Sequence, residues 1–230
     1  CPREARTELQ REQLRYSNES EQRAICDRFR LDTKPGPKAQ SAIRNWCVSG
    51  DATVEGYSRA IGVEVAFAQG EAGTGKTQVA THALAAVRAA GAVALVAAAT
   101  NLAATLFDGG WSLHALAKIP VEKDSNGNLF IRMAREGGTM TPQRLALLQG
   151  CSLLIVDEGP NLDKSVLEAL LDFLREHGCN MRVLICGDLR QIPPVVQGGS
   201  REQIIEASIV TSHEFPTMAK FALTQQYRAA

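Results

Sequence analysis

Residues 70 to 77 read GEAGTGKT, and this stretch decides the fold class. It satisfies the pattern G-x-x-x-x-G-K-[ST], the P-loop that cradles nucleotide phosphates. An apolar run at 63–68, typical of a buried strand, precedes it, and a helical segment begins at Thr77. A strand, a glycine-rich loop and a helix in this order predict a nucleotide-binding α/β fold.

The residues of the loop have different expected roles. Glycines let the backbone turn tightly, so that successive N–H groups point at phosphate oxygens. We expect Lys76 to reach the β and γ phosphates and Thr77 to bind the magnesium ion that bridges them. The predicted cofactors are therefore ATP and Mg²⁺. The predicted nucleotide contacts in the loop are Gly70, Glu71, Ala72, Gly73, Thr74, Gly75, Lys76 and Thr77.

Beyond the loop, short apolar runs alternate with helical segments. Because these runs are apolar at nearly every position, they suit strands buried on both faces. Alternation of such strands with helices predicts an α/β fold with a mostly parallel, doubly wound sheet. The expected strands are 63–68, 92–98, 152–156, 182–186 and 220–223. The expected helices are 39–48, 77–90, one capped by Thr141 before Pro142, and 163–177.

Length and composition limit the domain organisation. At roughly 150 residues per domain, a chain of 230 residues is expected to hold one large domain. The string KPGPK at 34–38 breaks a helix and marks a boundary,. We therefore predict a charged helical lead-in and linker over 1–36, as a short N-terminal extension, and a P-loop domain over 37–230.

The composition also excludes several classes of protein. The hydrophobic fraction of 45% is that of a globular domain, which excludes disorder and collagen,. Lysine plus arginine and aspartate plus glutamate both number 25, so any contact with nucleic acid must be local,. The longest apolar stretch, 89–99, is shorter than the roughly 20 residues of a membrane span,. No membrane partner is expected.

The six cysteines and the first residues bear on localisation. None of the cysteines forms a C-x-x-C pair, so reduced thiols in an intracellular protein are expected,. The chain opens with Cys1 and without a signal sequence, which favours a piece of a longer protein,. In a eukaryote we expect the nucleus, with the mitochondrion as the alternative.

A second motif is a predicted strand that ends in two acidic residues. Residues 152–158 read SLLIVDE, an apolar run that ends in two carboxylates. Asp157 is expected to hold magnesium, and Glu158 to orient the attacking water or accept its proton. Alone, the two would equally fit solvated turn acids. Behind a P-loop they predict ATP hydrolysis.

Four strings together resemble the superfamily-one DNA helicases of the Pif (petite integration frequency) family. They are GEAGTGKT, LLIVDE at 153–158, GDLRQIPPV at 187–195 and LTQQYR at 223–228. The segment GSREQIIEAS at 199–208 further resembles the Helitron-transposon type of this family. The resemblance covers residues 63–230.

This resemblance implies the RecA-like, ATP-binding half of a DNA helicase. Such a motor couples ATP hydrolysis to 5′ to 3′ movement on single-stranded DNA and to duplex unwinding, for DNA replication, repair, recombination or telomere maintenance. The implied partners are single-stranded or forked DNA and a second RecA-like domain. The chain ends shortly after Arg228, where that domain would begin, so it is expected to unwind little by itself.

The resemblance also implies roles for residues outside the P-loop. Gln191 would sense the γ phosphate and link the nucleotide site to DNA, with Asp188 supporting its turn. Arg228 would stabilise charge on the transferring phosphoryl group. A glutamine ahead of the P-loop would contact adenine. Gln40 lies at the more usual distance and is preferred, with Gln22 as the alternative.

Two further segments resemble the family's DNA contacts. Residues 99–104 read ATNLAA, so Thr100 and Asn101 are candidates for a DNA phosphate contact,. Asn101 replaces the usual glycine, and a tight turn there would need an asparagine that tolerates positive φ. In GGWSLHAL at 109–116, His114 is the expected strand contact, while Trp111 either stacks on a base or packs,.

Two other functions stay open at this level. A non-motor P-loop ATPase switch would need Lys76 and Asp157 but would have no use for Gln191 or His114. An inactive transposon-derived nucleotide-binding fragment would fold without hydrolysing ATP.

Overall fold

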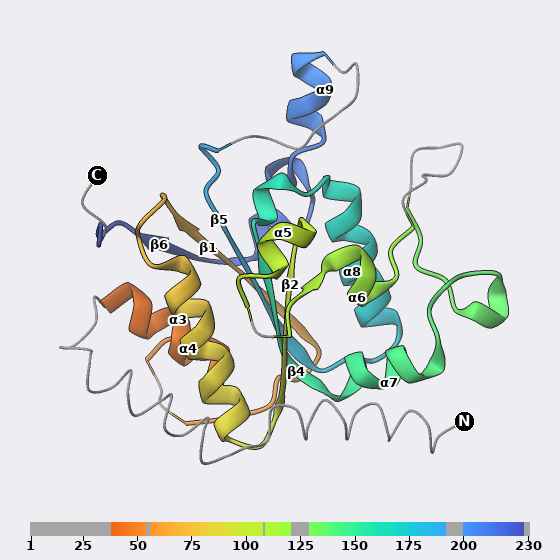
Figure 1. Cartoon of the computed structure of the whole chain (residues 1–230), viewed down its shortest axis with the longest axis horizontal. Coiled ribbons are helices and arrows are strands. Elements are labelled where there is room, and N and C mark those ends of the chain that lie inside the picture. The colour runs from red at the N-terminus through yellow and green to blue at the C-terminus, as the bar shows by residue number, and fades with distance from the viewer. Residues whose placement is uncertain (1–37, 54–55, 108, 121–128, 192–199, 228–230) are drawn as a thin grey trace.

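A six-stranded sheet forms the centre of the protein. The computed structural model describes residues 38–53, 56–107, 109–120, 129–191 and 200–227. Within these residues the strand order is β3-β2-β4-β5-β1-β6, and every neighbouring pair is parallel (Figure 1). The strands are β1 (Val63–Gly70), β2 (Val93–Ala98), β3 (Trp111–Ser112), β4 (Cys151–Asp157), β5 (Met181–Gly187) and β6 (Ala219–Leu223).

Helices cover both faces of this sheet. The first two, α3 and α4, pack on one face, while α6, α7 and α8 pack on the other (Figure 1). This arrangement confirms the predicted doubly wound α/β fold. The helices are α3 (Lys38–Ser49), α4 (Lys76–Ala89), α5 (Asn101–Ala104), α6 (Leu113–Ala117), α7 (Pro142–Gly150), α8 (Lys164–Glu176) and α9 (Arg201–Glu206). The 3-10 turns are η1 (Ala134–Glu136), η2 (Gly159–Asn161), η3 (Ile209–Thr211) and η4 (Phe215–Thr217).

Strand β4 shows why the expected strands are apolar throughout. All of its residues are buried. Leu153 and Ile155 face the core beneath α3 and α4, while Leu154 and Val156 face the core beneath α8. Because successive side chains point to opposite faces, a strand covered on both faces needs apolar residues at every position.

The helix ends follow the local signals in the sequence. The Thr141 hydroxyl accepts a hydrogen bond from the Arg144 N–H, and Pro142 occupies the first helical position of α7. Asp163 caps α8 in the same way through the Ser165 N–H. The predicted helices and strands therefore agree closely with the observed ones. Strand β3 was missed, because two residues are too few to show a periodic pattern,.

Some expectations fall on other parts of the chain. The lead-in predicted over 1–36 lies outside the described residues, so its boundary stays a prediction. Within the described residues, no helix is long and apolar enough to cross a membrane.

The cysteines of the described residues are reduced thiols. Cys47, Cys151, Cys179 and Cys186 are free and buried. Burial raises the pKa of the Cys179 thiol to about 11, which disfavours the reactive thiolate,.

Candidate active site

The P-loop joins the end of β1 to the start of α4. Gly73 and Gly75 have φ values of 82° and 85°, a left-handed conformation that favours glycine,. Lys76 Nζ donates to the carbonyl oxygens of Gly70 at 2.7 Å and Glu71 at 2.9 Å, so its ammonium lies against the loop. The Thr74 hydroxyl, almost fully buried, donates to the same Glu71 carbonyl at 2.8 Å. These hydrogen bonds within the loop hold its backbone around the Lys76 ammonium.

A buried carboxylate ends strand β4. Asp157 is 6% exposed, and its Oδ1 accepts a hydrogen bond from the Glu158 N–H at 3.0 Å. Burial raises the pKa of Asp157 and the charge of Glu158 adds to that effect, while the Glu158 N–H and the positive charge of Lys76 oppose it. Asp157 and the exposed hydroxyl residue Thr77 offer oxygen atoms, which Mg²⁺ prefers,. Their chemistry fits the expected cation.

Glu158 has an unusual backbone. Its φ of 54° and ψ of 35° place it in the left-handed region, which is uncommon for a residue with a side chain,. Among the described residues other than glycine, only Glu158 and Lys118 have positive φ. The Glu158 carboxylate accepts a hydrogen bond from the Asn161 amide at 3.3 Å. A strained backbone at an acidic residue, directly after a buried carboxylate, suits a residue that acts on a bound ligand.

The turn after β5 holds a second buried carboxylate. Asp188 is 6% exposed, and its Oδ1 accepts hydrogen bonds from the Gln69 amide and the Arg190 N–H, both at 3.0 Å. Gln69 Oε1 accepts in turn from the Leu189 N–H at 3.1 Å. Gln191 is exposed, and its N–H donates to the Asp188 carbonyl. Sequence reasoning missed Gln69, although a polar amide near the end of an apolar strand is a usable signal.

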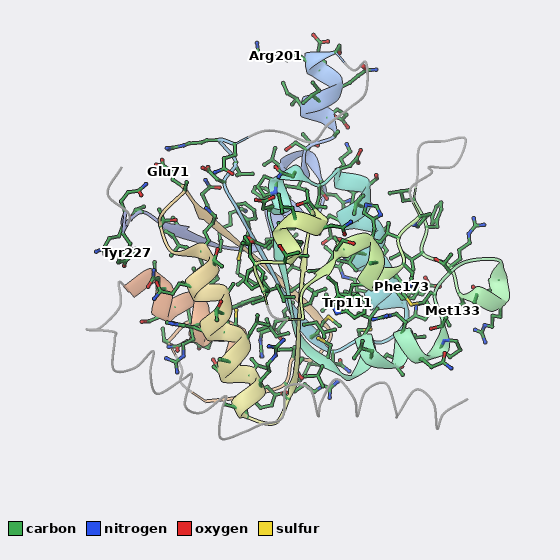
Figure 2. All side chains as sticks on the ribbon, viewed as in Figure 1. Glu71, Trp111, Met133, Phe173, Arg201 and Tyr227 are labelled. Carbon is green, nitrogen blue, oxygen red and sulfur yellow. The ribbon has the colours of Figure 1, made fainter. Side chains whose placement is uncertain are left out.

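The C-terminal segment of the described chain reaches the P-loop. The Tyr227 N–H donates to the Gly73 carbonyl at 3.0 Å, which brings the C-terminal segment to the loop. In Figure 2, Glu71 and Tyr227 both lie near the end of β1, far from Trp111. Arg228 follows directly but lies outside the described residues, so its role stays a prediction.

Helix α3 places one of the two candidate glutamines at the loop. Gln40 Nε2 lies 3.5 Å from the Thr74 carbonyl, and a Cβ added at Gly75 would lie 2.7 Å from the same nitrogen. Gln22 lies outside the described residues. The position of Gln40 favours the preferred residue, and its contact with adenine stays a prediction.

The family model of PIF1-like helicases matches residues 53–230, which is most of the chain and includes every loop of this site. The chain belongs to the PIF1-like helicase family. This confirms the predicted family, while the finer resemblance to the Helitron-transposon type stays a prediction.

Known PIF1-like proteins share part of their length with this chain. It is 32% identical over 140 residues to the mouse ATP-dependent DNA helicase PIF1, a match that covers 60% of this chain and 21% of the mouse protein. A Bacteroides Pif1 helicase in complex with ADP-AlF3 and ssDNA matches with a TM-score of 0.58 and 26% identity, over 73% of this chain and 39% of that one.

A third match concerns forked DNA. A structure of DNA unwinding at forked dsDNA by two coordinating Pif1 helicases matches with a TM-score of 0.58 and 26% identity. It covers 73% of this chain and 41% of that chain. The chain thus spans about a fifth of its curated mouse relative and about two fifths of these solved structures.

The first segment resembling the DNA contacts of PIF1-like helicases lies after β2. The Thr100 hydroxyl caps α5 by accepting from the Ala103 N–H at 3.1 Å. Asn101 is exposed and is the first residue of α5, without the positive φ that a tight turn would need. The asparagine therefore adopts no positive φ here, because the chain enters a helix at this point.

The second of these segments lies at the edge of the sheet. His114 Nδ1 donates to the Ile119 carbonyl at 3.1 Å, which leaves Nε2 as the edge for an external contact,. The Trp111 ring is partly buried against the core, with the Arg144 guanidinium 4.4 Å from its centroid. Of the two expected roles of Trp111, these contacts favour packing over base stacking.

The structure places these candidates on one side of the site. Ala98, at the end of β2, pairs with Asp157 of β4 on one flank and with Ser112 of β3 on the other. The P-loop follows β1, on the far side of β4 and β5. Thr100, Asn101 and His114 are therefore gathered at the β2-β3 side, while Lys76 and Gln40 lie at the β1-β6 side. Their contacts with DNA stay predictions.

Proposed function

We propose that this chain is the ATP-binding and ATP-hydrolysing half of a DNA helicase, which needs Mg²⁺ and couples hydrolysis to 5′ to 3′ movement on single-stranded DNA. The observation that carries this proposal is the nearly buried carboxylate of Asp157, which ends β4 at the same edge of the parallel sheet as the P-loop that carries Lys76. A cation between a carboxylate and a polyphosphate is the arrangement that phosphoryl transfer requires. The family match supports DNA as the partner.

The residues present suggest how ATP would bind. Lys76 donates to two neutral carbonyl oxygens, and phosphate oxygens are stronger acceptors because they are charged,. Nucleotide binding would therefore draw the ammonium from the loop to the β and γ phosphates. Thr77 and Asp157 would hold Mg²⁺, which neutralises charge on the phosphates.

Hydrolysis requires a group that acts on water. Glu158 follows the proposed metal ligand Asp157 in the chain, and its side chain would orient the attacking water or take its proton. Gln191 and Arg228 would complete the environment of the γ phosphate. Because Gln191 is exposed and lies on a turn between strands, it is suited to report the nucleotide state to another part of the protein.

The DNA partner and a second domain complete the proposal. Single-stranded DNA would cross the β2-β3 side of the sheet edge at Thr100, Asn101 and His114. Since the chain spans only part of its relatives, a second RecA-like domain would supply the movement that separates duplexes. The process would be DNA replication, repair, recombination or telomere maintenance, inside the cell, in the nucleus of a eukaryote or alternatively its mitochondrion.

Steady-state ATP hydrolysis with and without single-stranded DNA tests this proposal. The parent chain is compared with Glu158→Gln, Gln191→Ala and a control variant, Glu136→Gln, at an exposed position on η1. We expect DNA to raise the rate, and the first two variants to lose the increase. ATP binding without a DNA response would indicate a P-loop switch instead. Absence of nucleotide binding would indicate an inactive fragment.

A further inference from the structure

Two side chains fasten the turn after β5 to the segment that enters the P-loop. The Gln69 side chain contacts both Asp188 and Leu189, with its amide donating to the Asp188 carboxylate and its carbonyl accepting from the Leu189 N–H. Two residues further along the chain, the Glu71 carboxylate forms an ion pair with Arg190. We call these contacts the clasp.

The clasp connects two elements that are already rigidly paired. Gln69 lies opposite Gly187 in the parallel register of β1 and β5. The turn that carries Gln191 begins at the next residue, Asp188, whose carbonyl accepts the Gln191 N–H. A displacement of the P-loop strand would therefore move the turn through Gln69, while the sheet hydrogen bonds hold both strands in register.

We propose that Gln69 and Glu71 are positioning residues that transmit the state of the P-loop to the turn carrying Gln191. Neither side chain needs to touch the reacting phosphate. The inference rests on the proposed function, because it assigns the route by which bound nucleotide and DNA response are coupled.

The stronger half of the clasp is the contact of Gln69. The Asp188 carboxylate is nearly buried, so each hydrogen bond that it accepts offsets part of the cost of burying its charge,. The ion pair of Glu71 with Arg190 lies in solvent, with side chains 48% and 77% exposed, and is therefore weaker,. Gln69 is the residue to test first.

An exchange of chemical groups between Gln69 and Asp188 tests the inference. Gln69→Glu places two carboxylates against each other. Adding Asp188→Asn restores one amide and one carboxylate in contact, but it removes the hydrogen bond that the same Asp188 oxygen accepts from the Arg190 N–H. Gln149→Glu makes the same change at an exposed site, at the end of α7. The three variants and the parent chain are compared in nucleotide affinity, in DNA-stimulated hydrolysis and in hydrogen exchange of residues 188–191.

We expect Gln69→Glu to bind a fluorescent ATP analogue within about 2-fold of the parent, because the P-loop itself is unchanged. Its DNA-stimulated rate falls about 10-fold, the scale expected for lost hydrogen bonds to a charged group. The Leu189 amide exchanges faster. The double variant regains part of both properties, and Gln149→Glu behaves like the parent chain.

Each contrary result has a definite meaning. A Gln69→Glu variant with parental exchange at Leu189 and parental DNA stimulation would overturn the inference. A parent chain that does not hydrolyse ATP would contradict the proposed function instead. In that case the exchange of Leu189, measured without nucleotide, still decides whether Gln69 holds the turn.

Discussion

Two buried charged groups, at opposite edges of the sheet, differ in how many hydrogen bonds the protein supplies to them. At the amino edge, Arg182 of β5 is 2% exposed and donates to Glu64 at 2.9 Å, to the Ser58 carbonyl at 2.7 Å and to the Val48 carbonyl at 3.3 Å. At the carboxyl edge, Asp157 of β4 is buried almost as deeply. Among the described residues, its carboxylate accepts a single hydrogen bond, from the Glu158 N–H.

This difference separates a structural charge from a functional one. A buried ion whose hydrogen bonds are all supplied by the protein stabilises the fold only as long as its partners stay in place. A buried carboxylate with few partners keeps its desolvation cost, which a bound cation can offset. Arg182 therefore fastens α3 and the following loop to the sheet, whereas the Asp157 carboxylate stays available for the proposed cation.

The largest expected effect is on catalysis at the carboxyl edge. Glu158→Gln removes the carboxylate proposed to activate water, while it keeps the shape of the side chain. The kcat for ATP hydrolysis should fall about 10²- to 10⁴-fold, the usual contribution of general acid–base catalysis. Nucleotide affinity should be unchanged. Steady-state kinetics and equilibrium binding measure the two quantities, with Glu176→Gln as a control at the exposed end of α8.

A loss of binding in Glu158→Gln with unchanged turnover per bound nucleotide would contradict this assignment. It would mean that the strained backbone of Glu158 serves to shape the loop rather than to place a catalytic group.

The next effect is on stability at the amino edge. Arg182→Met removes the buried cation and leaves the Ser58 and Val48 carbonyls without this donor. The free energy of unfolding should fall by about 3 kcal/mol, at the low end for breaking a buried ion pair, because Glu64 is 38% exposed,. Urea denaturation measures the change. The exposed pair of Arg135 and Glu136 provides the control, since Arg135→Met should change stability by less than about 0.5 kcal/mol,.

If Arg182→Met left stability unchanged, the two edges would not differ as described. Nucleotide affinity of the folded variant should equal that of the parent, because Arg182 lies at the other end of β5.

A smaller effect is expected from Asp157→Asn, and it depends on pH. Burial raises the pKa of Asp157 in the folded protein, so the folded state binds the proton more tightly than the unfolded state does. The contribution of Asp157 to stability is therefore greatest below the pKa of about 3.9 of an ordinary aspartate. It is lost as the pH rises through the folded-state pKa.

Asparagine carries no charge, so the variant should lack this loss. Without Mg²⁺ at neutral pH, Asp157→Asn should have a higher free energy of unfolding than the parent chain, while Mg²⁺-dependent nucleotide binding should be much weaker,. Urea titrations at several pH values measure the stability. A variant less stable than the parent at neutral pH would show that Asp157 is a structural charge like Arg182.

Sequence patterns predict the parts of this site that are local in the chain. The P-loop, the acidic end of β4 and the caps of α7 and α8 are each encoded within a few neighbouring residues, and the structure has them where predicted. The local pattern can single out Gln69 as a polar residue at a strand end, but it cannot identify Asp188 as its partner, because the two residues are 119 positions apart. The preference for Gln40 likewise gains support only when α3 packs beside the loop, and Trp111 is explained only by its contact with Arg144.

The smallest effect concerns the solvent-exposed half of the clasp. Glu71 and Arg190 form an ion pair at the carboxyl edge, but their side chains are 48% and 77% exposed, so the pair lacks the buried setting of Arg182. Glu71→Arg should lower DNA-stimulated hydrolysis only about 2- to 3-fold, and Glu71→Arg combined with Arg190→Glu should restore it. Raising the salt concentration should lower the parent rate toward that of the single variant, because salt screens exposed charges. Rates measured at low and high salt check this result.

An effect of Glu71→Arg that persists unchanged at high salt and is not restored by Arg190→Glu would have another meaning. It would show that Glu71 acts on the phosphates and not through Arg190.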